Sequence, residues 1–167
     1  MTIALQPNID RNLIPILQQV ADPEIPVLTV LDMGVIREAI VKEGVVQIKL
    51  TPTYSGCPAM DVISDDLKAA FSENGMEATV ELVLAPAWTT DWMSEEGKQK
   101  MRAYGIAPPL EETADKDALL GNVRIVKCTN CGSKNTRVVS QFGSTACKAL
   151  FQCDDCQEPF DYFKCLK

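Results

Sequence analysis

Histidine is absent from this sequence of 167 residues. An imidazole is the usual base that activates a serine or cysteine nucleophile, so hydrolytic and acyl-transfer catalysis have little support. Long apolar runs are absent too: none approaches about 18 residues, and we expect no segment to span a bilayer. The N-terminal stretch has no basic region followed by an apolar core, so we do not expect a secretory signal.

Positive charge is scarce. Sixteen Lys and Arg stand against 23 Asp and Glu, which gives a net charge of −7 and a pI of about 4.6. This balance argues against binding to nucleic acid or to a membrane surface, since both require a concentrated positive face. Seven cysteines without a secretory signal indicate a reducing compartment, where paired cysteines more often bind metal than form disulfides. We expect an acidic, soluble, cytoplasmic protein.

The apolar pattern predicts an α+β domain followed by a small module. The predicted order in the first part is helix, strand, strand, helix, strand, with both helices on one face of the sheet. The predicted segments are a helix carrying Ile9, Leu13, Ile16, Leu17 and Val20; strands 35–41 and 45–50 around a glycine hairpin loop; a helix over 58–74; and a strand over 76–84. A further helix is expected to start at Ser94 and end at Gly105.

Composition suggests where the two parts meet. Residues 108–122 are polar and acidic, and we interpret them as a linker. The expected domains are therefore 1–107, the α+β domain, and 123–167, a β-rich module with four paired cysteines. The module is too short to bury much core, so metal binding would supply much of its folding free energy.

Two Cys-x₂-Cys pairs lie in this module: Cys128 with Cys131, and Cys153 with Cys156. Four thiolates from two tight turns form the ligand set of a zinc ribbon. Redox-active dithiols and rubredoxin-like iron are the alternatives. The remaining module cysteines, Cys147 and Cys165, lack ligand spacing to the pairs. They are either small buried side chains or additional thiols that handle a metal or cluster.

Cys57 stands apart from the other cysteines, in the stretch "TPTYSGCPAM" of residues 51–60. If Pro58 opens the helix, Cys57 is its N-cap, and the positive end of the helix would lower the thiol pKa. The thiol is then a reactive or ligand group, or else a half-buried structural one. Five polar residues could line the same end of the sheet, with turn formation as their alternative role: Asp22, Glu24, Asp32, Thr51 and Thr53.

These motifs together resemble known families. The stretch "DPEIPVLTVLDMG" (22–34) followed by "TPTYSGCP" (51–58) resembles the domain of iron–sulfur assembly factors of the SufT and cytosolic iron–sulfur targeting type. The stretches "PAWTTDWMSEEGKQKMRAYGIAPP" (86–109) and "FGSTACKALFQCDDCQEPFDYFKC" (142–165) extend this to a resemblance to the PaaD (PaaJ) family, accessory proteins of bacterial aerobic phenylacetate degradation. The resemblance runs from about residue 9 to the end of the chain.

The resemblance implies a non-catalytic role in the phenylacetyl-CoA epoxidase system, which has a di-iron oxygenase and a reductase with a [2Fe–2S] cluster. Such a protein would help to assemble or insert the cluster of the reductase, and the oxygenase is a further candidate partner. Cys57, with Asp22, Glu24, Asp32 and Thr53, would handle iron or a cluster, while zinc in the ribbon would be structural. A permanent structural subunit of the oxygenase complex and a rubredoxin-like electron carrier are the rival interpretations.

One thiolate cannot hold a cluster, because [2Fe–2S] clusters take four ligands. The others would come from a second protomer in a homodimer, from a partner's cysteines, or from Cys147 and Cys165. Trp88, Asp91 and Trp92 are expected to form a partner-docking face if the two indoles are exposed, and part of the core if they are not.

Overall fold

The chain forms two units, Met1–Gly97 and Lys98–Lys167, and each is described by itself. The computed structural model describes residues 7–110, 117–122 and 126–164. Within these ranges, no helix is both long enough and apolar enough to cross a membrane.

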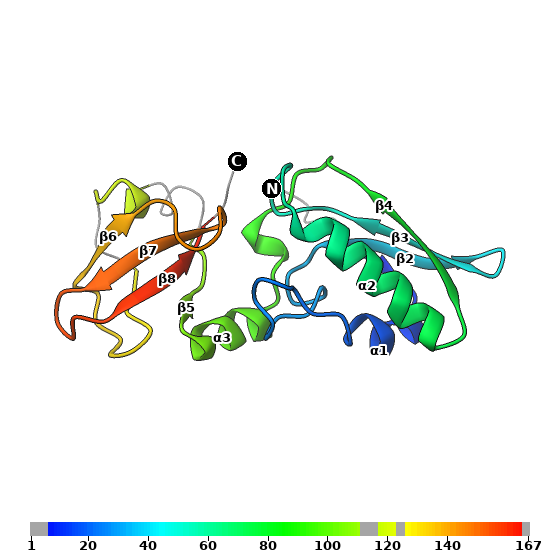
Figure 1. Cartoon of the computed structure of the whole chain (residues 1–167), viewed down its shortest axis with the longest axis horizontal. Helices are drawn as coiled ribbons and strands as arrows, with labels where there is room; N and C mark the ends of the chain where they lie inside the picture. The colour runs from blue at the N-terminus through cyan, green and yellow to red at the C-terminus, as the bar shows by residue number, and fades with distance from the viewer. Residues whose placement is uncertain (1–6, 111–116, 123–125, 165–167) are drawn as a thin grey trace. The chain divides into compact units, whose positions relative to one another are not determined.

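The first unit is built on a four-stranded sheet with the order β1-β2-β3-β4 (Figure 1). Its strands are β1 (Asn8–Ile9), β2 (Ile36–Lys42), β3 (Val45–Leu50) and β4 (Glu77–Leu82). The central pair β2 and β3 is antiparallel, whereas β1 and β4 run parallel to their neighbours. Glu43 and Gly44 form the two-residue loop of the central hairpin, both with positive φ, as the twist of a tight β-hairpin requires.

One face of this sheet is covered by the 3₁₀ turn η1 (Arg11–Leu13) and the helices α1 (Ile14–Leu17) and α2 (Ala59–Glu73) (Figure 1). Along β3, Val46, Ile48 and Leu50 are buried, while the intervening side chains are less so. The opposite face carries charge, including a 2.9 Å ion pair between Lys49 and Glu38. This alternation is that of an antiparallel pair with one face on the core.

The expectation of one long N-terminal helix is wrong. Ile9 belongs to β1, where it pairs with Ala39 of β2, and α1 has only four residues. Pro15 lies in the first turn of α1, where its missing N–H has no cost. Leu13, Ile16 and Leu17 are buried as the apolar spacing predicted, although a strand, a 3₁₀ turn and a short helix replace the single helix.

The segment after the first sheet leads into the second unit. Helix α3 (Glu95–Tyr104) begins where the Ser94 hydroxyl accepts a 2.9 Å hydrogen bond from the Gly97 N–H, and it ends before Gly105, whose φ is +99°. Both ends agree with the sequence prediction. Strand β5 (Ile106–Ala107) then pairs with β8 in the sheet of the second unit.

The second unit contains a four-stranded sheet with the order β5-β8-β7-β6. The other strands are β6 (Thr136–Ser140), β7 (Lys148–Cys153) and β8 (Pro159–Phe163). Phe151, Phe160 and Tyr162 form its aromatic core, with ring centroids of Phe151 and Tyr162 5.3 Å apart. The predicted class, an α+β domain with a β-rich cysteine module, is confirmed.

The division after Gly97 lies earlier than the domain boundary that composition suggested at residue 107. Residues 106–107 pair with β8, and Ala118, inside the expected linker, is buried in the core of the second unit. Local composition does not reveal these contacts. Residues 106–107 pair with a strand more than 40 residues away in sequence, and Ala118 is a small apolar residue within a polar stretch.

Candidate functional site

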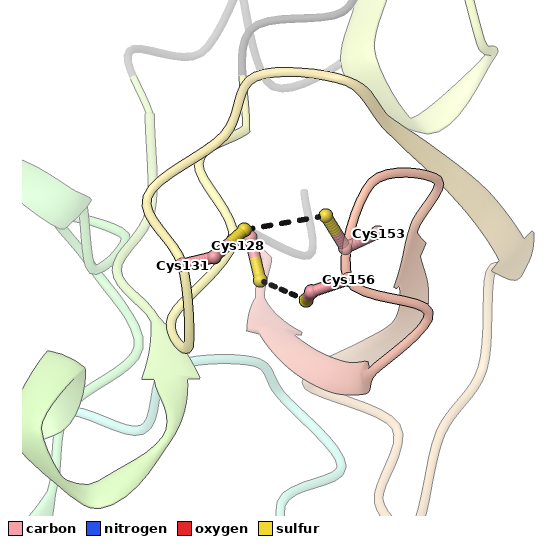
Figure 2. Close-up of side chains that lie close together, drawn as sticks. All are labelled: Cys128, Cys131, Cys153 and Cys156. Carbon is pink, nitrogen blue, oxygen red and sulfur yellow. Dashed lines mark hydrogen bonds between the residues drawn. The ribbon is translucent and has the colours of Figure 1, made fainter.

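The four paired cysteines converge on one point at the end of the second sheet (Figure 2). Their sulfur atoms all lie within 4.8 Å of one another. The Sγ atoms of Cys128 and Cys156 are 3.7 Å apart, and those of Cys131 and Cys153 are 3.6 Å apart. The four cysteines of the predicted site therefore lie together. Each Cys-x₂-Cys pair contributes one sulfur atom to each of the two contacts.

Two equivalent turns present these thiols: the first cysteine turn, residues 128–133, and the second cysteine turn, residues 153–158. In the first, the Cys128 N–H donates to the Ser133 carbonyl at 2.9 Å; in the second, the Cys153 N–H donates to the Glu158 carbonyl at 3.0 Å. The residue after the second cysteine of each turn has positive φ, +77° at Gly132 and +64° at Gln157. The two turns thus share one backbone design.

Several N–H groups point at the sulfur atoms. The Asn130 backbone N–H donates to the Cys128 sulfur at 3.4 Å, and its side-chain amide donates to that of Cys156 at 3.6 Å. The Glu158 N–H, followed by the Asn130 amide, lowers the pKa of the Cys156 thiol to about 7. These donors stabilise thiolate, which is the form that binds a metal.

The pKa of the Cys131 thiol is shifted in the opposite direction. The Ser133 N–H acts to lower the pKa of this thiol, but burial and the neighbouring thiols of Cys153, Cys156 and Cys128 outweigh it and raise the pKa to about 12. Four thiols packed this closely cannot all ionise without a cation, since each new negative charge opposes the next.

The spacing of the four sulfurs fits a tetrahedral metal ion. Zinc–sulfur bonds of about 2.3 Å in a tetrahedron require sulfur atoms about 3.8 Å apart. The observed contacts of 3.6 and 3.7 Å agree with this spacing, and all four sulfur atoms lie within 4.8 Å of one another. An all-thiolate donor set suits zinc or iron and excludes the hard cations that prefer oxygen.

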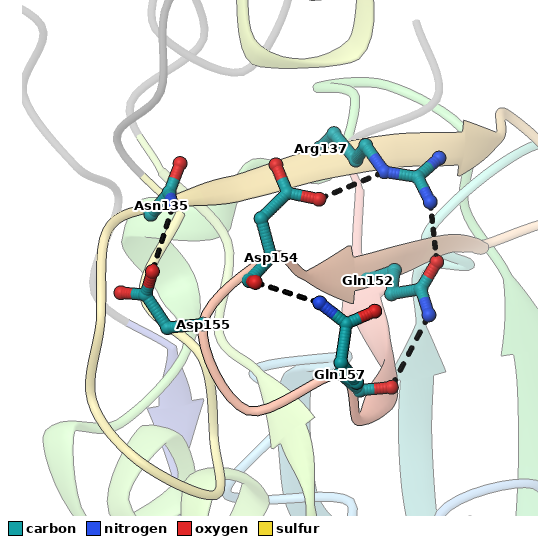
Figure 3. A network of polar contacts seen from close by, with 6 residues as sticks. All are labelled: Asn135, Arg137, Gln152, Asp154, Asp155 and Gln157. Carbon is teal, nitrogen blue, oxygen red and sulfur yellow. Dashed lines mark hydrogen bonds and ion pairs between the residues drawn. The ribbon is translucent and has the colours of Figure 1, made fainter.

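A polar network surrounds the second cysteine turn (Figure 3). Arg137 of β6 donates to Asp154 at 2.9 Å and to Gln152 at 2.6 Å. Gln152 in turn donates to the Gln157 carbonyl, and the Gln157 amide donates to the Asp154 carbonyl at 2.7 Å. The network fixes this turn to the strands that carry it.

Cys147 lies outside the four-thiol site, just before β7, whereas the second cysteine turn follows β7. Its side chain is buried, and its sulfur lies 3.1 Å from the Thr145 hydroxyl. Burial agrees with its interpretation as a small core side chain. Cys165, the second candidate thiol of this module, falls outside the described residues.

Cys57 lies in the first unit, in the turn that leads into α2. The Cys57 N–H donates to the Tyr54 carbonyl at 3.2 Å, which closes a turn over Ser55 and Gly56. Helix α2 has Pro58 as its N-cap, one residue later than predicted, and Pro58 already has helical dihedral angles. The Ala59 N–H nevertheless donates to the Cys57 sulfur, so the thiol does face the start of the helix.

The pKa of Cys57 is raised, contrary to the prediction. Burial is the largest cause, because removal of water disfavours the thiolate. The Ala59 N–H and the Tyr54 hydroxyl lower the pKa, while the carboxylates of Glu24 and Asp22 raise it further. The helix end acts as expected but is outweighed, and the thiol is held protonated at neutral pH.

The Asp22–Glu24 loop is therefore close to Cys57, as the sequence predicted for this end of the sheet. Asp22 is buried, and one of its oxygens accepts from the N–H groups of Glu24 and Ile25, both at 2.8 Å. This Asx turn shapes the loop. Asp22 therefore forms the turn of this loop and also lies near the Cys57 thiol.

Asp32 serves the architecture of the first unit. One carboxylate oxygen accepts from the Thr29 N–H and hydroxyl, both at 3.1 Å, and the other accepts from the Ser94 hydroxyl at 2.9 Å. Gly34, at the end of the same turn, has φ +67°, and a Cβ there would lie 2.1 Å from the Trp92 carbonyl oxygen. The Asp-x-Gly motif therefore joins a turn to the start of α3.

The two threonines before Cys57 differ. Thr51 is buried, and its hydroxyl is the one buried side-chain oxygen or nitrogen without a partner in the part of the chain that the structure describes. Thr53 is half-buried, beside the turn that holds Cys57. The part of Thr53 in iron handling stays a prediction.

The tryptophan segment is split between core and surface. Trp88 is only 2% exposed, and its indole N–H donates to the Met33 carbonyl at 2.8 Å, so of the two alternatives it takes the one in the core. A polar N–H with a backbone partner lets this large ring be buried without loss. Trp92 is half-buried under the Arg37 guanidinium, 3.7 Å from the ring centroid, and Asp91 is exposed.

Two residues with contacts at these sites were not singled out from the sequence. Tyr54, whose hydroxyl reaches the Cys57 sulfur, could have been found from its position three residues earlier, before a Ser-Gly turn. Asp155 bonds across the two cysteine turns, and it carried no sequence signal, since its partners lie some 20 residues away.

Comparisons with known proteins agree with this arrangement. Residues 11–82 match a family model described as an iron–sulfur cluster assembly protein, and residues 112–164 match one described as the PaaD zinc β-ribbon domain. A curated protein of Escherichia coli (strain K12), whose name describes it as one subunit of a "Putative 1,2-phenylacetyl-CoA epoxidase", is 47% identical over 153 residues, which cover 90% of each chain.

Two further relatives match about half of the chain. The "Fe-S protein maturation auxiliary factor" of Porphyromonas gingivalis (strain ATCC BAA-308 / W83) is 37% identical over 90 residues, 52% of this chain and 85% of the relative. A crystal structure of a "Domain of Unknown Function DUF59" from Bacillus anthracis is 29% identical with a TM-score of 0.50, covering 54% of this chain and 88% of that one.

A domain of the iron–sulfur assembly type followed by a four-cysteine zinc ribbon is the class of protein that the fold and the cysteine site define. The full-length match is more specific than either module. The chain belongs to the PaaD family, whose Escherichia coli member is named for the phenylacetyl-CoA epoxidase.

Proposed function

We propose that this chain is a non-catalytic, cytoplasmic accessory factor of the phenylacetyl-CoA epoxidase system, and that it assists the assembly or insertion of the iron–sulfur cluster of the reductase. The relatives named for that epoxidase and as an iron–sulfur maturation factor support the two halves of this proposal.

The observation that carries the proposal is the environment of Cys57. Its thiol is half-buried at the start of α2, with the carboxylates of Glu24 and Asp22 close enough to raise its pKa. A protonated thiol is a poor nucleophile and resists oxidation. An iron cation, attracted by the two carboxylates, can displace the proton, since metal binding releases protons from its ligands.

This arrangement suits a group that holds iron or a cluster briefly and releases it. One thiolate offers one of the four ligands that a [2Fe–2S] cluster takes. The other ligands would come from the client reductase or from a second copy of this chain. Loss of the cargo then returns Cys57 to its protonated state, with the pair of carboxylates disfavouring a free thiolate.

The ribbon has a different part in the proposal. Cys128, Cys131, Cys153 and Cys156 would hold a resident zinc ion, supported by the sulfur spacing and by the zinc-ribbon family match. Such an ion supplies folding free energy to a small unit rather than chemistry. Asp91 and the Trp92 ring, on the first unit, remain the candidates for partner docking.

The test compares two variants of neighbouring residues. The reductase is produced in cells together with wild type, Cys57→Ser or Ser55→Ala, and its iron, sulfide and visible absorption are measured after purification. Ser55 is exposed in the same turn and serves as the control. We expect a cluster-deficient reductase with Cys57→Ser alone and unchanged zinc in both variants; a full cluster with Cys57→Ser would refute the proposal.

A permanent structural subunit of the oxygenase complex is the second candidate, and the name of the Escherichia coli relative favours it. It predicts that the chain co-purifies with the di-iron component in stoichiometric amount whether or not Cys57 is present. Cluster content of the reductase would then be indifferent to Cys57→Ser.

A further inference from the structure

The two cysteine turns must be held together for the four sulfurs to meet. They are separated by about 20 residues of sequence, with β6 following the first turn and β7 leading into the second. The pairing of Thr136 with Cys153 begins where the turns meet the strands. The second cysteine turn joins β7 to β8 and is held by the sheet on both sides, whereas the first turn meets the sheet through β6. Contacts between the turns themselves decide whether the sulfurs keep their spacing.

Asp155 makes those contacts with both of its carboxylate oxygens. It lies between the two cysteines of the second cysteine turn, and its partners belong to the first turn and the residues that follow it. One oxygen accepts from the Ser133 hydroxyl at 2.5 Å. The other accepts from the Asn135 side-chain amide at 2.8 Å (Figure 3). Ser133 is itself fixed, because its hydroxyl accepts the Asn135 backbone N–H at 2.9 Å.

The neighbouring carboxylate bonds to a strand instead. Asp154 pairs with Arg137 at 2.9 Å. Arg137 belongs to β6 rather than to a cysteine turn. Asp155 therefore joins the two turns through both of its carboxylate oxygens, in addition to the bond from the Asn130 side-chain amide to the Cys156 sulfur. Both partners of Asp155 are neutral donors, so its contribution depends on hydrogen-bond geometry more than on charge.

We propose that Asp155 is a positioning residue of the four-thiol site: by bonding Ser133 and Asn135 across the two cysteine turns, it sets how tightly the site binds its metal and how slowly it releases it. This inference rests on the resident zinc of the proposed function and is independent of the role of Cys57. Residues that orient metal ligands typically change metal affinity by about 10- to 100-fold when replaced.

Four full-length proteins test this inference: wild type, Asp155→Ala, Asp155→Asn and Glu158→Gln. Asp155→Ala removes both cross-turn bonds, and Asp155→Asn keeps the shape and one acceptor oxygen. Glu158→Gln is the charge control, because Glu158 is exposed in the same turn and contributes only its backbone to the described hydrogen bonds. The measurements are zinc affinity by chelator competition, the rate of zinc release, and the d–d absorption of the Co²⁺-substituted protein.

We expect Asp155→Ala to bind zinc about 10- to 100-fold more weakly, with faster release and a shifted Co²⁺ spectrum. Asp155→Asn should recover most of the affinity, and Glu158→Gln should equal wild type. The inference is overturned if Asp155→Ala stays within about twofold of wild type. It is equally overturned if all three variants lose the same affinity, because the cause would then be negative charge near the cation.

Ser133→Ala provides a second route should Asp155→Ala fail to fold. It removes one of the two cross-turn bonds, and an intermediate rise in the rate of zinc release is expected; an unchanged rate overturns the inference. A wild-type protein without any zinc would refute the resident metal of the proposed function. Zinc in wild type with no effect of Asp155 would refute this inference alone.

Discussion

The Ser94 hydroxyl donates a 2.9 Å hydrogen bond to the buried carboxylate of Asp32, a residue 62 positions earlier in the chain. The same hydroxyl accepts the Gly97 N–H as the cap of α3, and the Ser94 N–H donates to the Asp32 carbonyl at 2.9 Å. Two turns of the first unit are thus held together through both the side chain and the backbone of one aspartate. Asp32 therefore has a structural role in the first unit.

Asp32→Ala should destabilise the first unit by about 3 kcal/mol, because the donors of Thr29 and Ser94 lose a charged, buried acceptor. Ser94→Ala should cost about 1 kcal/mol, the usual effect of a lost helix cap. Urea unfolding followed by tryptophan fluorescence measures both, since Trp88 and Trp92 lie in this unit. Unchanged stability of Asp32→Ala, with loss of cluster delivery, would instead assign Asp32 to iron handling.

Gly34 and Gly44 form a matched pair for a second prediction. Both have positive φ, but a Cβ at Gly34 would meet the Trp92 carbonyl oxygen at 2.1 Å, whereas nothing lies within 4 Å of one at Gly44. Gly34→Ala should therefore cost roughly 3 kcal/mol or more, from strain and overlap together. Gly44→Ala should cost only about 1 kcal/mol. Equal losses in urea unfolding would show that backbone strain alone is responsible.

The sequence predicted those features that depend on neighbours in the chain. Alternating side chains in β3 indicated the buried face of the sheet, and the regular spacing of the cysteine pairs indicated a four-thiol site. Ser94 and Gly105 marked the ends of α3. In each case the signal and the structure lie within a few residues of one another, so local chemistry decides the outcome.

The features that the sequence did not predict depend on packing between distant segments. Ile9 is in a strand because β2 lies beside it, and Trp88 is buried because the Met33 carbonyl is available to its indole. The direction of the Cys57 pKa shift was missed for the same reason: the helix end is local, whereas burial and the Glu24 carboxylate arise from tertiary structure.

The raised pKa of Cys57 leads to a third prediction. Because less thiolate is present at a given pH, the pH midpoint for alkylation of Cys57 by iodoacetamide should lie above that of an ordinary cysteine. Glu24→Gln removes a charge that raises the pKa and should move the midpoint down. Tyr54→Phe removes a hydrogen bond that lowers the pKa and should move it up.

Peptide mapping by mass spectrometry separates Cys57 from the other thiols in this experiment, and Cys57→Ser supplies the background. The two variants shift the midpoint in opposite directions only if Glu24 and Tyr54 both act on this sulfur. A midpoint below that of a free cysteine in wild type would mean that the helix end outweighs burial and would contradict the prediction.

The shared backbone of the two cysteine turns leads to the last prediction. Gly132 and Gln157 occupy equivalent positions with positive φ, but Gln157 also donates from its side chain to the Asp154 carbonyl. Gly132→Gln should cost about 1 kcal/mol, since a Cβ there meets nothing within 4 Å and only the backbone is strained. Gln157→Gly relieves the same strain but loses a hydrogen bond, so the stability of the zinc-loaded protein should change by less than about 0.5 kcal/mol. Thermal unfolding of both variants checks this asymmetry, and equal effects would mean that the two turns do not share the left-handed conformation.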